Sequence, residues 1–232
     1  MTKQIQYALK TGSAIFIGYF PVAMAFGMLA KSYEITLFES FFFSVMVFAG
    51  ASQFIALNLM ATGSSVSSII LTTLLVNFRH FLMSAYLSTK LNKIAKKYVF
   101  LIAFGVTDEV FSILSLEKQK LSYSFILSLQ LLAYSGWVGG TITGYILGGF
   151  FSQILMKSLG IALYTLLLAI LIPEIKKSLK MFTLALLSGL LNTVLIRFEF
   201  IPDGWSIICC ILIVSFAGSF FITNKAYEDK GL

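Results

Sequence analysis

The chain has 232 residues, of which 58% are hydrophobic and only 12% are charged. Soluble domains carry roughly 25% charged residues and alternate polar with apolar positions, so this composition excludes an ordinary soluble enzyme or binding domain. The formal net charge is +7, and basic residues gather in two short connectors: Lys90, Lys93, Lys96 and Lys97, and then Lys176, Lys177 and Lys180. Such clusters are typical of loops that face anionic lipid, and they do not indicate nucleic-acid binding.

Apolar segments follow one another along the chain, separated by charged residues, proline or glycine. They cover residues 12–30, 37–61, 65–88, 98–116, 122–150, 156–173, 181–197 and 204–223. A helix needs about 20 apolar residues to cross a bilayer core roughly 30 Å thick, so the short sixth segment is either re-entrant or tilted. The sequence predicts an all-α, polytopic integral membrane protein with seven or eight transmembrane or re-entrant helices, forming one domain over residues 1–232.

The first segment, Gly12 to Ala30, is longer than a signal-peptide core and is followed by further spans, so we expect it to remain in the protein. The sequence allows two arrangements of the spans relative to the two sides of the membrane. Three predicted spans separate the two basic connectors, although the positive-inside rule would put both connectors in the cytoplasm. Either one of the three segments does not cross the membrane, or one basic connector lies outside.

The second segment contains the small residues Gly50, Ala51 and Ser52, followed by the uncharged amide of Gln53. Small residues allow two helix backbones to pack closely. They also allow a helix to unwind in the membrane so that free N–H groups face a ligand. The sequence alone favours the two interpretations about equally.

Four ionisable residues lie near the middle of predicted spans: Arg79 and His80 in the third, and Asp108 and Glu109 in the fourth. A charge at this depth costs roughly 2.5 to 3.5 kcal/mol on insertion scales, so such residues usually face other helices and find partners. In an antiparallel hairpin Arg79 and Asp108 reach similar depth, which predicts an ion pair from Arg79 to Asp108 or Glu109. The pair either joins two helices structurally, or it leaves one carboxylate free to bind a proton or an ammonium group.

Two further patterns concern helix faces. Asn77 and His80 are three residues apart and share one face of the third segment, and Gly105 and Asp108 are expected to share a face of the fourth.

The fifth segment carries a glycine at every fourth position: Gly136, Gly140, Gly144 and Gly148. In membranes such a stripe receives a partner helix, which lies either in the same chain or in another subunit.

Metal and enzyme chemistry find little support in this sequence. The chain has one histidine and two adjacent cysteines, Cys209 and Cys210, so its sequence does not indicate a zinc site. We expect no cofactor, and the absence of a hydrolase-type nucleophile motif argues against a membrane-embedded enzyme.

The residues singled out above resemble one family when they are taken in order. The runs Gly50-Ala51-Ser52-Gln53-Phe54, Asn77-Phe78-Arg79-His80 and Asp108-Glu109 are similar to the AzlC family, the large subunits of branched-chain amino-acid exporters. The resemblance implies export of valine, leucine, isoleucine and also methionine across the bacterial cytoplasmic membrane, driven by the proton-motive force. It also implies a small AzlD-type membrane subunit as partner.

A chemical hypothesis follows for a zwitterionic substrate. Asp108 or Glu109 would hold the ammonium group, and Arg79 would hold the carboxylate together with Gln53 or the backbone of Gly50, Ala51 and Ser52. Proton coupling would involve whichever carboxylate is free, with His80 and Asn77 along the pathway. The alternative is a membrane scaffold or receptor subunit whose ion pairs are structural.

Overall fold

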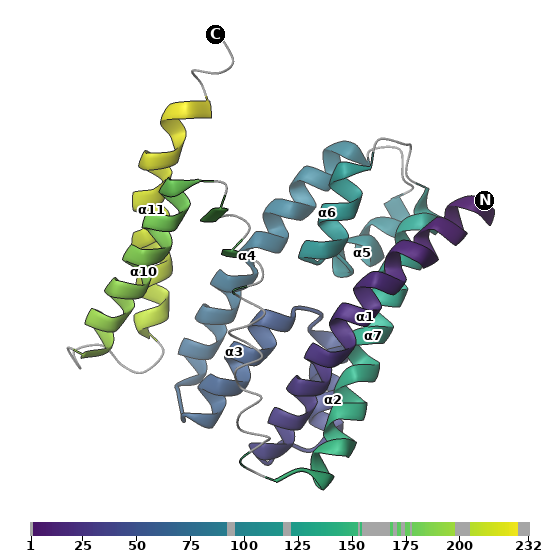
Figure 1. Ribbon diagram of the computed structural model, residues 1–232, viewed down its shortest axis with the longest axis horizontal. Helices are drawn as coiled ribbons and strands as arrows, with labels where there is room; N and C mark the ends of the chain where they lie inside the picture. Colours follow the sequence, from purple (N-terminus) through teal and green to yellow (C-terminus); the bar gives the residue numbers. More distant parts are fainter. Residues whose placement is uncertain are drawn as a thin grey trace. The chain divides into compact units, whose positions relative to one another are not determined.

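The computed structural model describes residues 2–91, 96–117, 122–152, 178–197 and 205–226, together with residues 154, 168, 171–172 and 175–176. All regular secondary structure in these ranges is helical (Figure 1). The helices are α1 (Thr2–Ser32), α2 (Leu37–Met46), α3 (Gly50–Ala61), α4 (Val66–Lys90), α5 (Lys96–Phe104), α6 (Asp108–Leu116), α7 (Tyr123–Leu147), the 3-10 turn η1 (Gly148–Phe150), α10 (Leu179–Arg197) and α11 (Trp205–Ala226).

Among the described helices, 4 stretches are long and apolar enough to cross a membrane: Gln4–Ser32, Val66–Lys90, Tyr123–Phe150 and Leu179–Arg197. They coincide with the first, third, fifth and seventh predicted spans, so the all-helical prediction is confirmed over the described residues, with helices long and apolar enough to cross a membrane. The total of seven or eight crossing segments stays a prediction. The sixth predicted span, 156–173, lies almost entirely outside the described residues.

The second and fourth predicted spans are not continuous helices. Residues 47–49 interrupt the second between α2 and α3, and residues 105–107 interrupt the fourth between α5 and α6. At the second interruption the Thr107 side chain caps a new helix by accepting a hydrogen bond from the backbone N–H of Val110. The expectation that Gly105 and Asp108 share one helix face is therefore wrong, because Gly105 lies outside the helix that Asp108 begins.

The described residues form two compact units. The first contains residues 1–54 and 77–163, and the second contains residues 55–76 and 164–232, so the boundaries fall inside α3 and α4.

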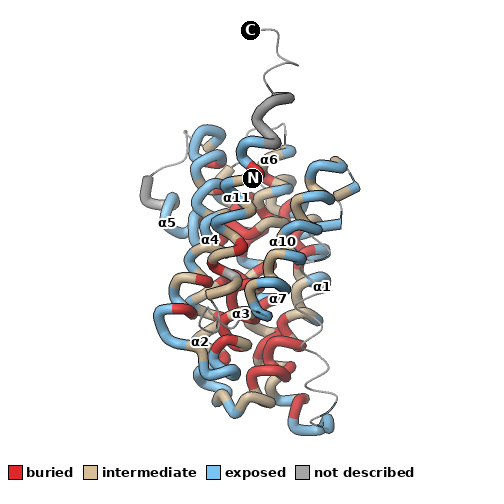
Figure 2. Tube along the Cα trace, turned by 90° about the vertical axis from the view of Figure 1, so that its left-hand side faces the viewer, coloured by how far each residue is buried: buried red, intermediate tan, exposed pale blue. Residues whose placement is uncertain are grey.

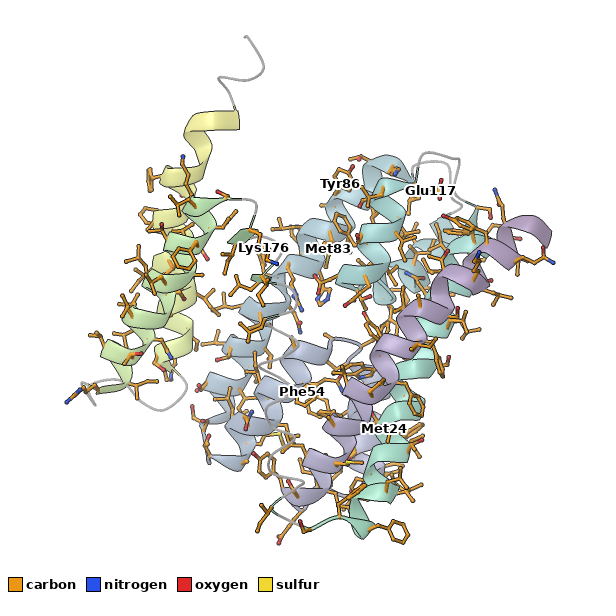
Figure 3. All side chains as sticks on the ribbon, viewed as in Figure 1. Met24, Phe54, Met83, Tyr86, Glu117 and Lys176 are labelled. Carbon is orange, nitrogen blue, oxygen red and sulfur yellow. The ribbon has the colours of Figure 1, made fainter. Side chains whose placement is uncertain are left out.

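In the first unit, α1 and α7 lie side by side along most of their lengths (Figure 1), and both helices contribute many buried residues (Figure 2). The glycine stripe lies in this contact. Gly136, Gly140 and Gly144 lie against the α1 backbone at Phe16, Phe20 and Met24, respectively. Met24 is labelled on α1 beside α7 in Figure 3. Gly148 is buried at the end of α7. The partner helix of the stripe is thus α1 of the same chain.

A second contact joins the C-terminal half of α4 to α6. The Tyr86 ring meets the Phe111 ring edge-on with centroids 5.6 Å apart. Beyond it, the Lys90 ammonium donates to the backbone carbonyls of Leu114, Ser115 and Glu117 at 2.9, 2.6 and 2.7 Å. A lysine that binds the last carbonyls of a helix also complements the negative end of the helix dipole. Lys90 therefore fixes the C-terminal end of α6 against α4.

In the second unit α10 and α11 pack on each other. The Cys210 thiol lies 3.9 Å from the side-chain oxygen of Asn192, and Leu184 lies against Gly218. α10 has no buried residue, and most of its large apolar side chains are exposed. Such a surface is suited to contact with lipid or another hydrophobic partner.

Candidate functional site

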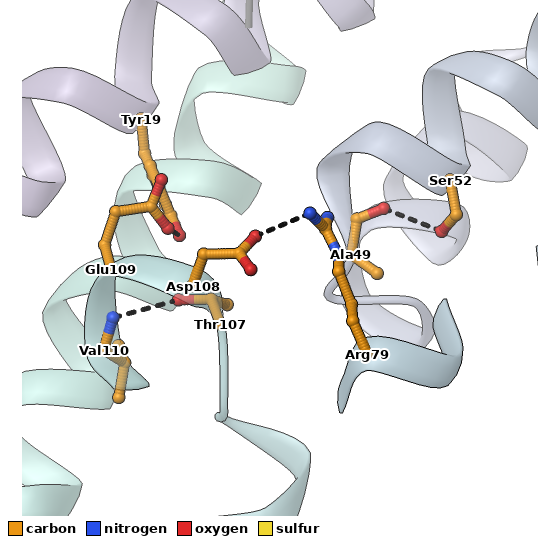
Figure 4. Close-up of polar contacts among 8 residues, drawn as sticks. All are labelled: Tyr19, Ala49, Ser52, Arg79, Thr107, Asp108, Glu109 and Val110. Carbon is orange, nitrogen blue, oxygen red and sulfur yellow. Dashed lines mark hydrogen bonds and ion pairs between the residues drawn. The ribbon is translucent and has the colours of Figure 1, made fainter. Parts of the chain in front are cut away.

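The first turn of α6 carries both acidic residues, Asp108 and Glu109. The Asp108 carboxylate accepts from the Arg79 guanidinium, with Nη1 and Oδ2 3.0 Å apart and each side chain 31% exposed. The predicted ion pair is confirmed, with Asp108 as the partner of Arg79 (Figure 4). Because Arg79 is on α4, this contact holds the N-terminal end of α6 as Lys90 holds its C-terminal end.

Glu109 turns away from Arg79 and meets α1. Its carboxylate accepts a hydrogen bond from the Tyr19 hydroxyl (Figure 4). The Tyr19 ring is held edge-on by Phe48 at 6.2 Å and by Trp137 at 5.7 Å between ring centroids. The sequence does not indicate a role for Tyr19, because one tyrosine in an apolar span gives no signal that distinguishes it from an ordinary packing residue.

The two acids therefore have partners of different charge. The Arg79 cation balances the formal charge of Asp108, whereas Glu109 meets a neutral hydroxyl. When Glu109 is ionised, Arg79, Asp108 and Glu109 together carry one excess negative charge. A proton or a cationic group such as an ammonium would balance that charge.

Gln53, on the first turn of α3, lies in a buried polar network rather than at a free surface. Its side-chain oxygen accepts from Trp137 Nε1 at 2.8 Å, and its amide nitrogen donates to Ser44 Oγ at 3.2 Å. Ser44 Oγ in turn lies 2.8 Å from Thr141 Oγ1. Gln53 is 0% exposed. In this structure both ends of its amide bind protein groups, so Gln53 orders the start of α3.

Ser52 and Asn77 connect the same turn of α3 to α4. The Asn77 amide nitrogen donates to Ser52 Oγ at 3.0 Å, and the Ser52 hydroxyl donates to the Ala49 carbonyl at 2.9 Å. The side-chain oxygen of Asn77 and Nε of Arg79 are buried atoms without a hydrogen-bond partner among the described residues. Helix α4 therefore carries one buried acceptor, the Asn77 side-chain oxygen, and one buried donor, Arg79 Nε, that form no hydrogen bond with the described residues.

Gly50 and Ala51 begin α3, where the first N–H groups of a helix have no acceptor within the helix. A Cβ on Gly50 would overlap the Trp137 ring, so only glycine fits against this indole.

His80 is half-buried beside Arg79 on α4 and lies next to the ion pair rather than in it.

An aromatic cluster joins the two helix interruptions. Phe48 in the first and Phe104 before the second both pack on Tyr134 of α7, with centroids 5.3 and 6.0 Å from its ring. The Tyr134 hydroxyl donates to the Val45 carbonyl at 3.0 Å. Within the described ranges no three His, Cys, Asp or Glu side chains lie close enough to hold a metal ion. The site is therefore a pair of interrupted helices with one ion pair and one separately bound carboxylate.

Comparison with known proteins gives matches over this same region. The family model described as AzlC protein matches residues 14–151, a range that contains every site residue named above. An uncharacterized membrane protein of Archaeoglobus fulgidus is 35% identical over 166 residues, which cover 70% of this chain and 72% of that protein. Inner membrane protein YgaZ of Escherichia coli is 32% identical over 190 residues, 78% of either chain.

A third relative has a name that states a function. The branched-chain amino acid transport protein AzlC of Bacillus subtilis is 30% identical over 139 residues, which cover 59% of this chain and 54% of that protein. No solved structure matches the chain.

Proposed function

We propose, because this chain belongs to the AzlC family of membrane proteins, that it is the large permease subunit of a branched-chain amino-acid exporter. Its substrates would be valine, leucine and isoleucine, with methionine as a further substrate. Export would cross the bacterial cytoplasmic membrane and would be driven by the proton-motive force. A small AzlD-type membrane subunit would complete the transporter.

The observation that carries the proposal is the separation of the two acids at the start of α6. Asp108 is already balanced by Arg79, whereas the partner of Glu109 among the described residues is the neutral Tyr19 hydroxyl. A carboxylate in this position can hold a proton in one state and the ammonium group of a substrate in another, because each adds one positive charge. Alternation of Glu109 between its protonated state and its ammonium-bound state would exchange an outgoing amino acid for an incoming proton.

The start of α3 supplies groups for the substrate carboxylate. Interrupted helices in transporters commonly place the positive ends of their dipoles at anionic groups of the substrate. The backbone N–H groups of Gly50, Ala51 and Ser52 would take this role, and the unused Nε of Arg79 adds a charged donor. Phe48 and Phe104 offer apolar surface for a branched side chain.

The proposal is tested by efflux from cells that lack their own branched-chain amino-acid exporters. Cells loaded with valine or leucine through dipeptides should release them faster when this chain and its small partner are expressed together. Cells with an empty vector, and cells with each subunit alone, are the controls. Equal release from all four cell lines, with both subunits present in the membrane, would contradict the proposal and favour a scaffold or receptor role.

A further inference from the structure

The orientation of the Asn77 amide is fixed by its neighbours. A serine hydroxyl has one proton, and Ser52 uses that proton on the Ala49 carbonyl at 2.9 Å. Ser52 Oγ can therefore only accept from Asn77, so Asn77 presents its NH₂ group to Ser52 at 3.0 Å. The side-chain oxygen of Asn77 consequently points elsewhere, as an acceptor.

That oxygen is buried and has no donor among the described residues. Native structures rarely leave buried acceptors without a partner, and each such atom calls for a missing partner such as water, an ion or a ligand. Asn77 lies two residues before Arg79, whose guanidinium binds Asp108, and its own partner Ser52 is on the first turn of α3. Through Ser52, the unused oxygen lies beside the first turn of α3, whose backbone N–H groups are the proposed donors for the substrate carboxylate.

We propose that Ser52 is a positioning residue that sets substrate selectivity by holding the Asn77 oxygen as an acceptor for the substrate's ammonium group. The Ser52 hydroxyl does not touch the substrate and acts only through Asn77. The inference rests on the proposed function and deepens it, because it states why the site selects α-amino acids. An α-keto acid with the same side chain has a carbonyl oxygen in place of the ammonium group, so it offers no donor to Asn77.

Replacement of Ser52 by alanine would release this constraint. The Asn77 amide would then be free to turn, and its NH₂ group could donate to the carbonyl of a keto acid. We expect the preference for leucine over 4-methyl-2-oxopentanoate, measured as the ratio of their kcat/KM values, to fall about tenfold, which corresponds to one hydrogen bond. Ser52→Thr retains the hydroxyl and should restore most of the ratio.

The experiment compares both compounds in vesicles that contain the purified protein with its partner subunit. Ser44→Ala is the matched control, because it also removes a buried serine hydroxyl in the first unit but has no described contact with Asn77. If Ser52 only joins α3 to α4, both alanine variants should lower thermal stability and slow both compounds equally. An unchanged leucine preference in folded Ser52→Ala would overturn the inference.

A second variant and a binding measurement cover the case in which Ser52→Ala does not fold. Asn77→Ala should reduce the rise in unfolding temperature caused by leucine, relative to that caused by 4-methyl-2-oxopentanoate. Equal stabilisation by both compounds in the wild type would also overturn the inference. Failure of the wild type to transport either leucine or valine would instead contradict the proposed function itself, so the two failures are distinguishable.

Discussion

Replacement of Glu109 by glutamine is expected to abolish uphill efflux of valine and leucine while the protein remains folded. Glutamine keeps the size of the side chain and can still accept a hydrogen bond from Tyr19, but it can hold neither a proton nor an ammonium group by charge. Loss of one charge-assisted contact in the binding site costs roughly 1.5 to 3 kcal/mol, or about 10- to 100-fold in affinity, before the loss of coupling is counted. Transport rate and the amount of protein in the membrane should be measured on the same cells.

The matched variant is Asp108→Asn, one position earlier on α6. It leaves the half-buried Arg79 cation without its partner, and an unbalanced charge within a membrane span costs roughly 2.5 to 3.5 kcal/mol on insertion scales. We therefore expect Asp108→Asn to lower the amount of folded protein together with transport, whereas Glu109→Gln lowers transport alone. Normal uphill efflux from Glu109→Gln at normal expression would remove this carboxylate from the mechanism.

Replacement of Gly144 by leucine should prevent stable folding of the first unit. A Cβ at this position would overlap the Met24 carbonyl oxygen and lie 2.5 Å from Met24 Cα, so the clash involves backbone atoms that cannot rotate away. Ordinary overpacking costs about 1 to 3 kcal/mol, and separation of the α1 and α7 backbones should cost more. The measurement is the yield of monodisperse protein in detergent.

Gly139 provides the control for this variant on the same helix. A Cβ there would lie 3.7 Å from the Phe20 ring, which is an ordinary contact distance. Gly139→Ala should therefore behave like the wild type, while even Gly144→Ala should lower the yield. Equal yields from the two alanine variants would show that the close approach of α1 and α7 is not required for folding.

Part of this architecture follows from simple counting along the sequence. Long uninterrupted apolar stretches located α1, α4, α7 and α10, because backbone hydrogen bonding in a membrane leaves a helix as the available structure. An ion pair from Arg79 to Asp108 or Glu109 followed from matching depths in a helical hairpin, and the structure identifies Asp108 as the partner. The glycine spacing indicated a packing face, but the identity of its partner, α1, depends on tertiary contacts that periodicity does not contain.

The interruptions were harder to predict because the residues around them remain apolar. Phe48 and Val106 would fit a continuous helix, and the breaks are stabilised by distant groups such as Trp137 against Gly50 and Gln130 against Gly105. The same reason explains why Tyr19 was missed, since its role depends on Glu109, which lies 90 positions later in the chain. The sequence indicated which residues carry charge, whereas the structure assigned partners to Arg79, Asp108 and Glu109.

We propose that this chain couples branched-chain amino-acid movement to protons through the Glu109 carboxylate. The most direct measurement uses vesicles that contain the purified chain and its small partner, with labelled leucine at equal concentration on both sides. An imposed proton gradient should drive leucine to accumulate on the more acidic side, and a protonophore or Glu109→Gln should prevent this accumulation. Leucine that stays at equal concentration under the same gradient, with folded wild-type protein, would contradict the account.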